Sequence, residues 1–132
     1  MSISKERHLE TTAQGSAFLK AASAWGKVPD LPKNCPLPVA VGSVAASYKV
    51  ELRDTLVAYL HAYVSNQIHA ALRLMKLGQQ TGVELLAELE PCIIKVAEAA
   101  SQTTLDDLGS TAFMADICAM QHEQLQSRMF RS

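Results

Sequence analysis

The segment from Val50 to Leu77 contains neither proline nor glycine. Apolar residues recur in it every three or four positions, which is the spacing of an amphipathic α-helix. These residues are Leu52, Leu56, Tyr59–Leu60, Tyr63, Ala70–Ala71 and Leu74. The pattern predicts a long helix with one apolar stripe, ended by Gly78. It is the strongest helical pattern in the sequence. The length of 132 residues suits a single domain.

Three further segments share the helical period. Residues 4–25 contain Gly15, and a glycine inside a helix indicates that another backbone comes close. Residues 82–100 form a helix opened by Gly82, in which Pro91 predicts either a kink or a break into two helices. Residues 111–126 predict a last helix. Within residues 82–100, the residues expected to point inward are Leu85–Leu86, Leu89, Ile93, Val96 and Ala100.

Residues 26–38 contain four prolines and therefore predict a connector. Residues 37–48 are uncharged and mostly small, which favours a short, fully buried helix that starts near Pro38. A strand would need a second strand to pair with, and no other segment has that pattern. The sequence thus predicts an all-α fold, a single bundle of five or six helices over residues 1–132.

Composition narrows the class of protein. The net charge of −1 provides no general attraction to nucleic acid or to anionic lipid. The uncharged stretch from Thr55 to Leu72 holds two histidines, Asn66 and Gln67, too many polar groups for a membrane span. The N-terminus lacks an apolar leader, and the three cysteines form no C-x-x-C pair. We therefore expect a cytoplasmic protein with reduced thiols, without a nucleic-acid or membrane partner.

The sequence offers little for catalysis. There is no G-x-S-x-G motif, and the segment Gly78 to Gly82 has no lysine, so it is not a phosphate-binding loop. Cys92 lies between Pro91 and Ile93, where a cysteine is usually a small core residue. We predict that the chain is not an enzyme and holds no cofactor.

A metal site is the main alternative. His61 and His69 are about 12 Å apart along a helix, too far to share one ion. Cys118 and His122 are one helical turn apart, and Glu123 follows. Neutral imidazole and thiolate suit nickel or zinc. A small metal-binding or metal-sensing helical protein that uses Cys118, His122 and Glu123 is therefore a second hypothesis.

The C-terminal segment holds Arg128, Phe130 and Arg131. Arginine and aromatic residues dominate the binding energy of many protein interfaces. A solvated chain end would explain the same residues equally well. The residues themselves leave both interpretations open.

Several spaced motifs resemble one family. They are Gly15 with Ala17–Phe18–Leu19, residues 38–42 (PVAVG), Tyr59–Leu60, Asn66, residues 70–74 (AALRL), residues 77–79 (LGQ), Thr81–Gly82, Leu85–Leu86, Met120, His122–Glu123 and residues 127–132 (SRMFRS). In this order and near this spacing, they resemble the C-terminal part of the urease accessory protein UreF.

Two positions differ from the family pattern. Lys76 replaces a proline, which predicts that the long helix runs further, and Gln121 replaces a basic residue.

The resemblance implies an all-α protein without catalysis of its own. UreF proteins bind the accessory protein UreD (UreH in some systems), and the complex recruits the GTPase UreG to deliver nickel to apo-urease. Family members dimerise. Carried over by position, the expected partner contacts are Arg128, Phe130, Arg131, His122, Glu123 and Gln79.

The family also has an N-terminal half, with a Gly/Ser/Phe-rich motif, for which this sequence has no counterpart. The resemblance therefore implies a fragment or a shortened variant. Helices that pack on that half in longer relatives are expected to expose apolar surface here. Lower stability than in a full-length relative is also expected.

Overall fold

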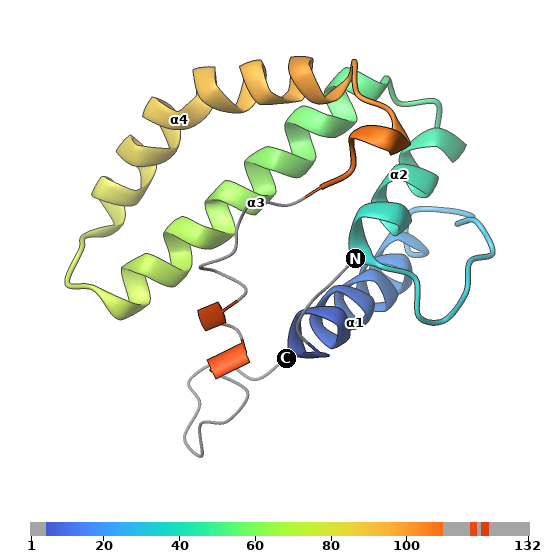
Figure 1. Ribbon diagram of the computed structural model, residues 1–132, viewed down its shortest axis with the longest axis horizontal. Coiled ribbons are helices and arrows are strands. Elements are labelled where there is room, and N and C mark those ends of the chain that lie inside the picture. The colour runs from blue at the N-terminus through green and yellow to red at the C-terminus, as the bar shows by residue number, and fades with distance from the viewer. Residues whose placement is uncertain (1–4, 110–116, 119, 122–132) are drawn as a thin grey trace. The chain divides into compact units, whose positions relative to one another are not determined.

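The computed structural model describes residues 5–109, 117–118 and 120–121, and across these residues it contains helices and no strand. The helices are α1 (Lys5–Ala22), α2 (Leu37–Ser47), α3 (Leu52–Leu74) and α4 (Gln79–Ala100), followed by the short 3₁₀ turn η1 (Leu105–Asp107) (Figure 1). The all-α prediction is confirmed, with four α-helices in the described residues in place of five or six.

The difference in number has two sources. Helix α4 continues through Pro91, so the predicted break into two helices does not occur. Of the predicted last helix, residues 117–118 and 120–121 are helical, and the rest lies outside the described residues.

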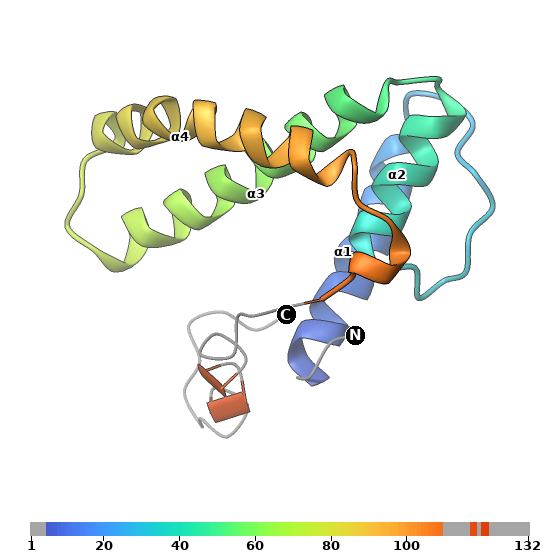
Figure 2. The same cartoon turned by 45° about the horizontal axis from the view of Figure 1, so that its top comes forward.

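The chain divides into two compact units, residues 1–49 with 108–132 and residues 50–107. Within the first unit α1 packs on α2, and within the second α3 packs on α4. Figures 1 and 2 show both pairs side by side. The expectation of a single domain over residues 1–132 stays a prediction.

Helix α1 lies directly against the connector at Gly15. A Cβ atom at this position would overlap the carbonyl oxygen of Cys35 and lie 3.0 Å from the backbone nitrogen of Leu37. Two hydrogen bonds hold the same contact. The Leu37 backbone N–H donates to Oγ1 of Thr11 at 3.3 Å, and the Ser16 hydroxyl donates to the Lys33 carbonyl at 2.6 Å. The predicted close approach of a second backbone at Gly15 is confirmed.

Helix α2 begins after Pro36 and has Pro38 in its first turn, where the missing N–H costs no helical hydrogen bond. The helix is not fully buried, however, which corrects the sequence-based prediction. Ala40 is its buried residue, and Val39 is exposed. Among the described residues of its unit, α2 packs on one helix, α1, and no other helix covers its remaining sides.

Helices α3 and α4 pack through small and branched side chains. A Cβ atom on Gly82 would lie 2.8 Å from Cδ1 of Leu72 and 3.3 Å from Cγ2 of Ile68. Ile93 and Ala97 are also buried. The prediction that Gly82 opens the helix is therefore wrong. Helix α4 begins at Gln79, and Gly82 lies inside it, where the absence of a side chain lets α3 approach.

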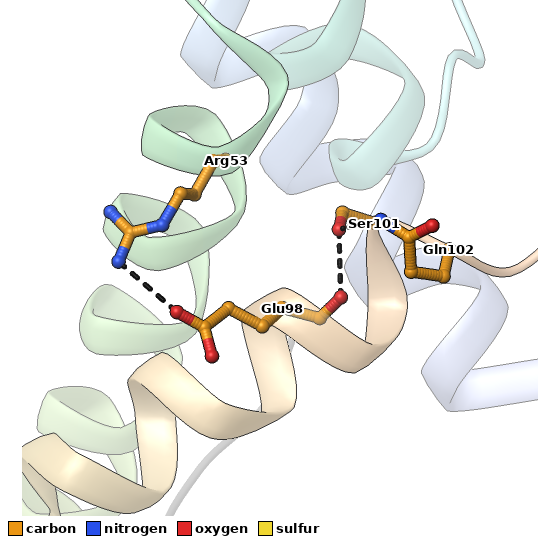
Figure 3. A network of polar contacts seen from close by, with 4 residues as sticks. All are labelled: Arg53, Glu98, Ser101 and Gln102. Atoms are coloured by element: carbon orange, nitrogen blue, oxygen red, sulfur yellow. Dashed lines mark hydrogen bonds and ion pairs between the residues drawn. The ribbon is translucent and has the colours of Figure 1, made fainter.

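Helices α3 and α4 form a helical hairpin. At the end of this hairpin opposite the α3–α4 turn, an ion pair joins the two helices. Nη2 of Arg53 on α3 lies 3.3 Å from Oε1 of Glu98 on α4 (Figure 3). The Ser101 hydroxyl donates to the carbonyl oxygen of Glu98 at 2.7 Å and so closes the last turn of α4. Both charged side chains are more than half exposed, so water and salt weaken their attraction.

We therefore predict a small energetic effect of this ion pair. A double-mutant cycle with Arg53→Ala and Glu98→Ala should give a coupling free energy of about 0.2–1 kcal/mol, typical of exposed pairs. Chemical denaturation at low and high salt measures it, and salt should reduce it. A coupling above about 2 kcal/mol that persists in high salt would contradict this interpretation.

Candidate partner-binding surface

Gln79 is the predicted contact residue that the structure describes. It is the first residue of α4 and is exposed. Gly78 before it has an extended backbone (φ −76°, ψ 155°), and its carbonyl accepts the first helical hydrogen bond, from Gly82 N–H at 3.4 Å. The other predicted contacts lie outside the described residues: Arg128, Phe130, Arg131, His122 and Glu123.

The turn before Gln79 corrects a second expectation. Helix α3 ends at Leu74 and does not extend to Lys76 or Leu77. Met75 is extended (φ −120°, ψ 153°), although its N–H still donates to the carbonyl of Ala71 at 2.8 Å. The Leu77 N–H then donates to the carbonyl of Met75 at 2.9 Å, which tightens the turn. The proline of the family is thus not needed to end this helix.

The apolar stripe predicted for α3 lies on two different sides of the helix. Ile68 and Leu72 face Gly82 of α4. At about 100° per residue, Leu52, Tyr63 and Leu74 lie nearly half way round the helix from that side. All three are exposed, by 59%, 56% and 61% respectively. Helix α3 therefore carries a second apolar side that α4 does not cover.

Helix α4 has the same property. Leu85, Leu89 and Val96 were predicted to point inward, but they are exposed by 37%, 40% and 46%. Cys92, predicted to be a core residue, is exposed as well. These four residues follow one another at alternating steps of four and three, the spacing of a helix-packing seam. A parallel seam through Gly82, Ile93 and Ala97 is the one that α3 buries.

The two uncovered stripes lie at different angles from the packed sides of their helices. The stripe on α3 faces away from α4, whereas the stripe on α4 lies about 75° round that helix from its buried seam. We call the two stripes together the open face and define it by Leu52, Tyr63, Leu74, Leu85, Leu89 and Val96.

The open face is uncharged along both stripes. Between Tyr63 and Ala70 the polar residues are Ser65, Asn66, Gln67 and His69, and no Asp, Glu, Lys or Arg occupies a stripe position. Tyr59 shares this side of α3. Partial burial raises the pKa of the Tyr59 hydroxyl, and the neighbouring Tyr63 raises it further. The surface is thus suited to apolar packing and not to binding a charged ligand.

The histidines of α3 do not form a metal site. The carbonyl oxygen of Ser65 accepts a hydrogen bond from Nδ1 of His69 at 2.8 Å, so this nitrogen carries the proton. In the part of the chain that the structure describes, no group of three His, Cys, Asp or Glu residues could hold a metal ion. Cys118 is exposed, whereas His122 and Glu123 lie outside the described residues. The metal-binding alternative stays a hypothesis.

Within the described residues, no helix has both the length and the apolarity required to cross a membrane. The described residues form an all-α protein with exposed apolar side chains on its helices. The UreF family matches residues 1–90. A protein of Mesorhizobium japonicum named urease accessory protein UreF is 48% identical over 131 residues, which cover 98% of this chain and 59% of that protein.

Two other relatives have the same name. The one from Agrobacterium fabrum is 50% identical and the one from Rhizobium leguminosarum 46%, each over 98% of this chain and 59% of the relative. The chain belongs to the UreF family, as the motif resemblance predicted. It spans about three fifths of the length of these relatives. Their name describes an accessory protein and not a catalyst.

Proposed function

We propose that this chain acts in the maturation of urease as a non-catalytic scaffold. It joins UreD (UreH) and the GTPase UreG, so that nickel is delivered to apo-urease. The observation that carries the proposal is the match of 98% of the chain to proteins named urease accessory protein UreF. The paired helices and their exposed apolar side chains support a role in binding proteins.

The partner contact proposed for UreD is the C-terminal segment with Arg128, Phe130 and Arg131, and it includes His122 and Glu123. Guanidinium groups supply several hydrogen-bond donors to carbonyls and carboxylates, and an aromatic ring supplies a large apolar area. Gln79 adds an exposed amide at the start of α4. Nickel is the cargo of the complex in this proposal, and the chain needs no cofactor of its own.

The protein is further proposed to work in the cytoplasm as a homodimer. Two copies would present two C-terminal segments and so capture two UreD molecules. Light scattering on the purified chain measures this state. A mass that stays at the 14.3 kDa of one chain at high concentration would contradict the dimer.

Urease maturation tests the proposed function. Cells that express the urease genes of the same source without their UreF member should produce apo-urease. Expression of this chain is expected to raise the nickel content and the activity of the urease purified from them. A full-length relative serves as positive control. Urease that stays free of nickel with this chain, while the control restores it, would contradict the proposal.

A further inference from the structure

The turn after α1 exposes the one tryptophan of the chain on a fixed backbone. Trp25 is 89% exposed, and its N–H donates to the carbonyl oxygen of Ala22 at 3.0 Å. Gly26, the next residue, has a φ of +153°, a conformation that favours glycine. The Tyr48 hydroxyl lies against Gly26, where a Cβ atom would overlap it, and donates to the carbonyl oxygen of Lys27 at 3.4 Å. The end of α2 therefore holds the turn that carries Trp25.

This part of the chain is basic, although the whole chain is nearly neutral. Residues 11–49 contain one acidic residue, Asp30, and four lysines, a net charge of +3. The lysines are Lys20, Lys27, Lys33 and Lys49, and all four are exposed. Among the described residues none of them forms an ion pair. Because Tyr48 contacts Lys27, positions 27 and 49 lie close together, and we call Trp25, Lys27, Tyr48 and Lys49 the Trp25 surface.

Both helices of this unit end at the Trp25 surface. Helix α2 begins beside α1, where the Leu37 N–H donates to Thr11, and it ends beside the turn that follows α1. Lys20 lies in the last turn of α1 and Lys49 directly after α2, so both offset the negative ends of the helix dipoles. That role does not extend to Lys27, which lies outside both helices.

These features fit the recognition of an acidic protein segment. Tryptophan is enriched among the residues that dominate interface energy, and a fixed turn loses little conformational entropy on binding. Ammonium groups beside an apolar ring complement carboxylates beside an apolar side chain. We propose that the Trp25 surface binds a segment of a partner protein in which Asp or Glu flanks an apolar residue. Membrane recognition typically uses clusters of about four to eight basic residues, more than the lysines that adjoin this turn.

The Trp25 surface shares no residue with the contact proposed for UreD. We therefore assign it to a different protein, and the inference does not depend on the role in urease maturation.

Because the chain has one tryptophan, its fluorescence reports on this surface directly. The probe is a synthetic peptide in which Asp and Glu flank a central pair of leucines and which contains no aromatic residue. Titration with this peptide is expected to shift the emission of Trp25 to shorter wavelength and to saturate, since the exposed ring becomes covered. A peptide with Asn and Gln in place of the acids should give no shift. High salt should weaken the binding of the acidic peptide.

Paired lysine variants separate this surface from net charge. The double variant Lys27→Gln and Lys49→Gln retains the reporter and should bind the acidic peptide at least about tenfold more weakly. The matched control is Lys76→Gln with Lys95→Gln, which removes two exposed lysines of the other unit and should leave binding unchanged. Trp25→Ala, followed by calorimetry, should also weaken binding at least about tenfold. Circular dichroism should retain its helical content, because the wild-type side chain is exposed.

Four results would overturn the inference. One is the absence of a saturable shift with the acidic peptide. Another is equal weakening by both lysine pairs, because binding would then follow net charge alone. The third is a shift with vesicles of phosphatidylcholine and phosphatidylserine but none with the peptide, which would assign the surface to a membrane. The fourth is a shift that appears when the protein alone is concentrated and its mass doubles, because a second copy would then cover Trp25. Neither urease nor UreD takes part in these measurements, so their failure is distinct from failure of the proposed function.

Discussion

Replacement of Gly15 by alanine is expected to destabilise the α1–α2 unit by about 2–3 kcal/mol, the upper part of the range for overpacking. Alanine would gain about 1 kcal/mol of helix propensity over glycine. The new methyl group, however, would overlap the carbonyl oxygen of Cys35. A backbone atom cannot rotate away, so α1 and the connector must separate. This movement also weakens the hydrogen bonds from Leu37 to Thr11 and from Ser16 to Lys33.

Gly42 provides the matched control for this substitution. It lies in α2, and a Cβ atom there would have no neighbour within 4 Å. Gly42→Ala should therefore stabilise the protein by about 0.5–1 kcal/mol. Denaturant unfolding followed by circular dichroism measures both variants. If Gly15→Ala proved as stable as the wild type, the tight contact between α1 and the connector would be wrong.

The second large effect is expected at the C-terminal segment. The double substitution Arg128→Ala and Phe130→Ala should weaken capture of UreD at least about 30-fold, corresponding to the loss of one interface hot spot. Both the charged donor and the aromatic contact area are removed. A pull-down series at increasing UreD concentration measures the change, and circular dichroism should show that the helices are retained.

The control for this experiment replaces an arginine and an aromatic residue that lie outside the C-terminal segment. Arg53 is exposed on α3, and Trp25 is 89% exposed after α1. The double variant Arg53→Ala and Trp25→Ala should capture UreD as the wild type does. If the tail variant kept wild-type capture, or if both double variants lost it equally, the assignment of Arg128 and Phe130 to the contact would be rejected.

Much of the fold follows from local sequence rules. Five helical segments were predicted from the apolar period and from the placement of proline and glycine, and the four that precede residue 109 are helices. Gly15 was correctly predicted to mark a close backbone approach, because only a missing side chain permits it. The predicted role of Gly82, to start the helix, was wrong. A glycine near a turn can start a helix or accommodate a neighbour, and the sequence does not distinguish the two.

The direction of apolar side chains was harder to predict. The period shows which residues share a side of a helix, but not whether a neighbour covers that side. Leu85, Leu89 and Val96 have the spacing of core residues, and they are exposed because α3 packs on the adjacent seam. Cys92 is exposed for the same reason. The sequence did contain a signal for the open face. On both α3 and α4, apolar residues occupy more positions around the helix than one partner helix can bury.

The prediction of the contact residues depended mainly on the resemblance to the family. Physical chemistry alone left Arg128 and Phe130 equally consistent with a solvated end and with an interface. Gln79 is the one of this set that the structure describes, at the exposed start of α4. Only a binding experiment can therefore assign the set.

Complex formation with UreD tests the central claim most directly. This chain is co-purified with UreD from the same source, and UreG and GTP are then added. The account predicts a stoichiometric complex of this chain with UreD that retains UreG on gel filtration. Absence of a complex, from a chain shown to be folded by circular dichroism, would contradict the claim that this part of the UreF family carries the docking surface.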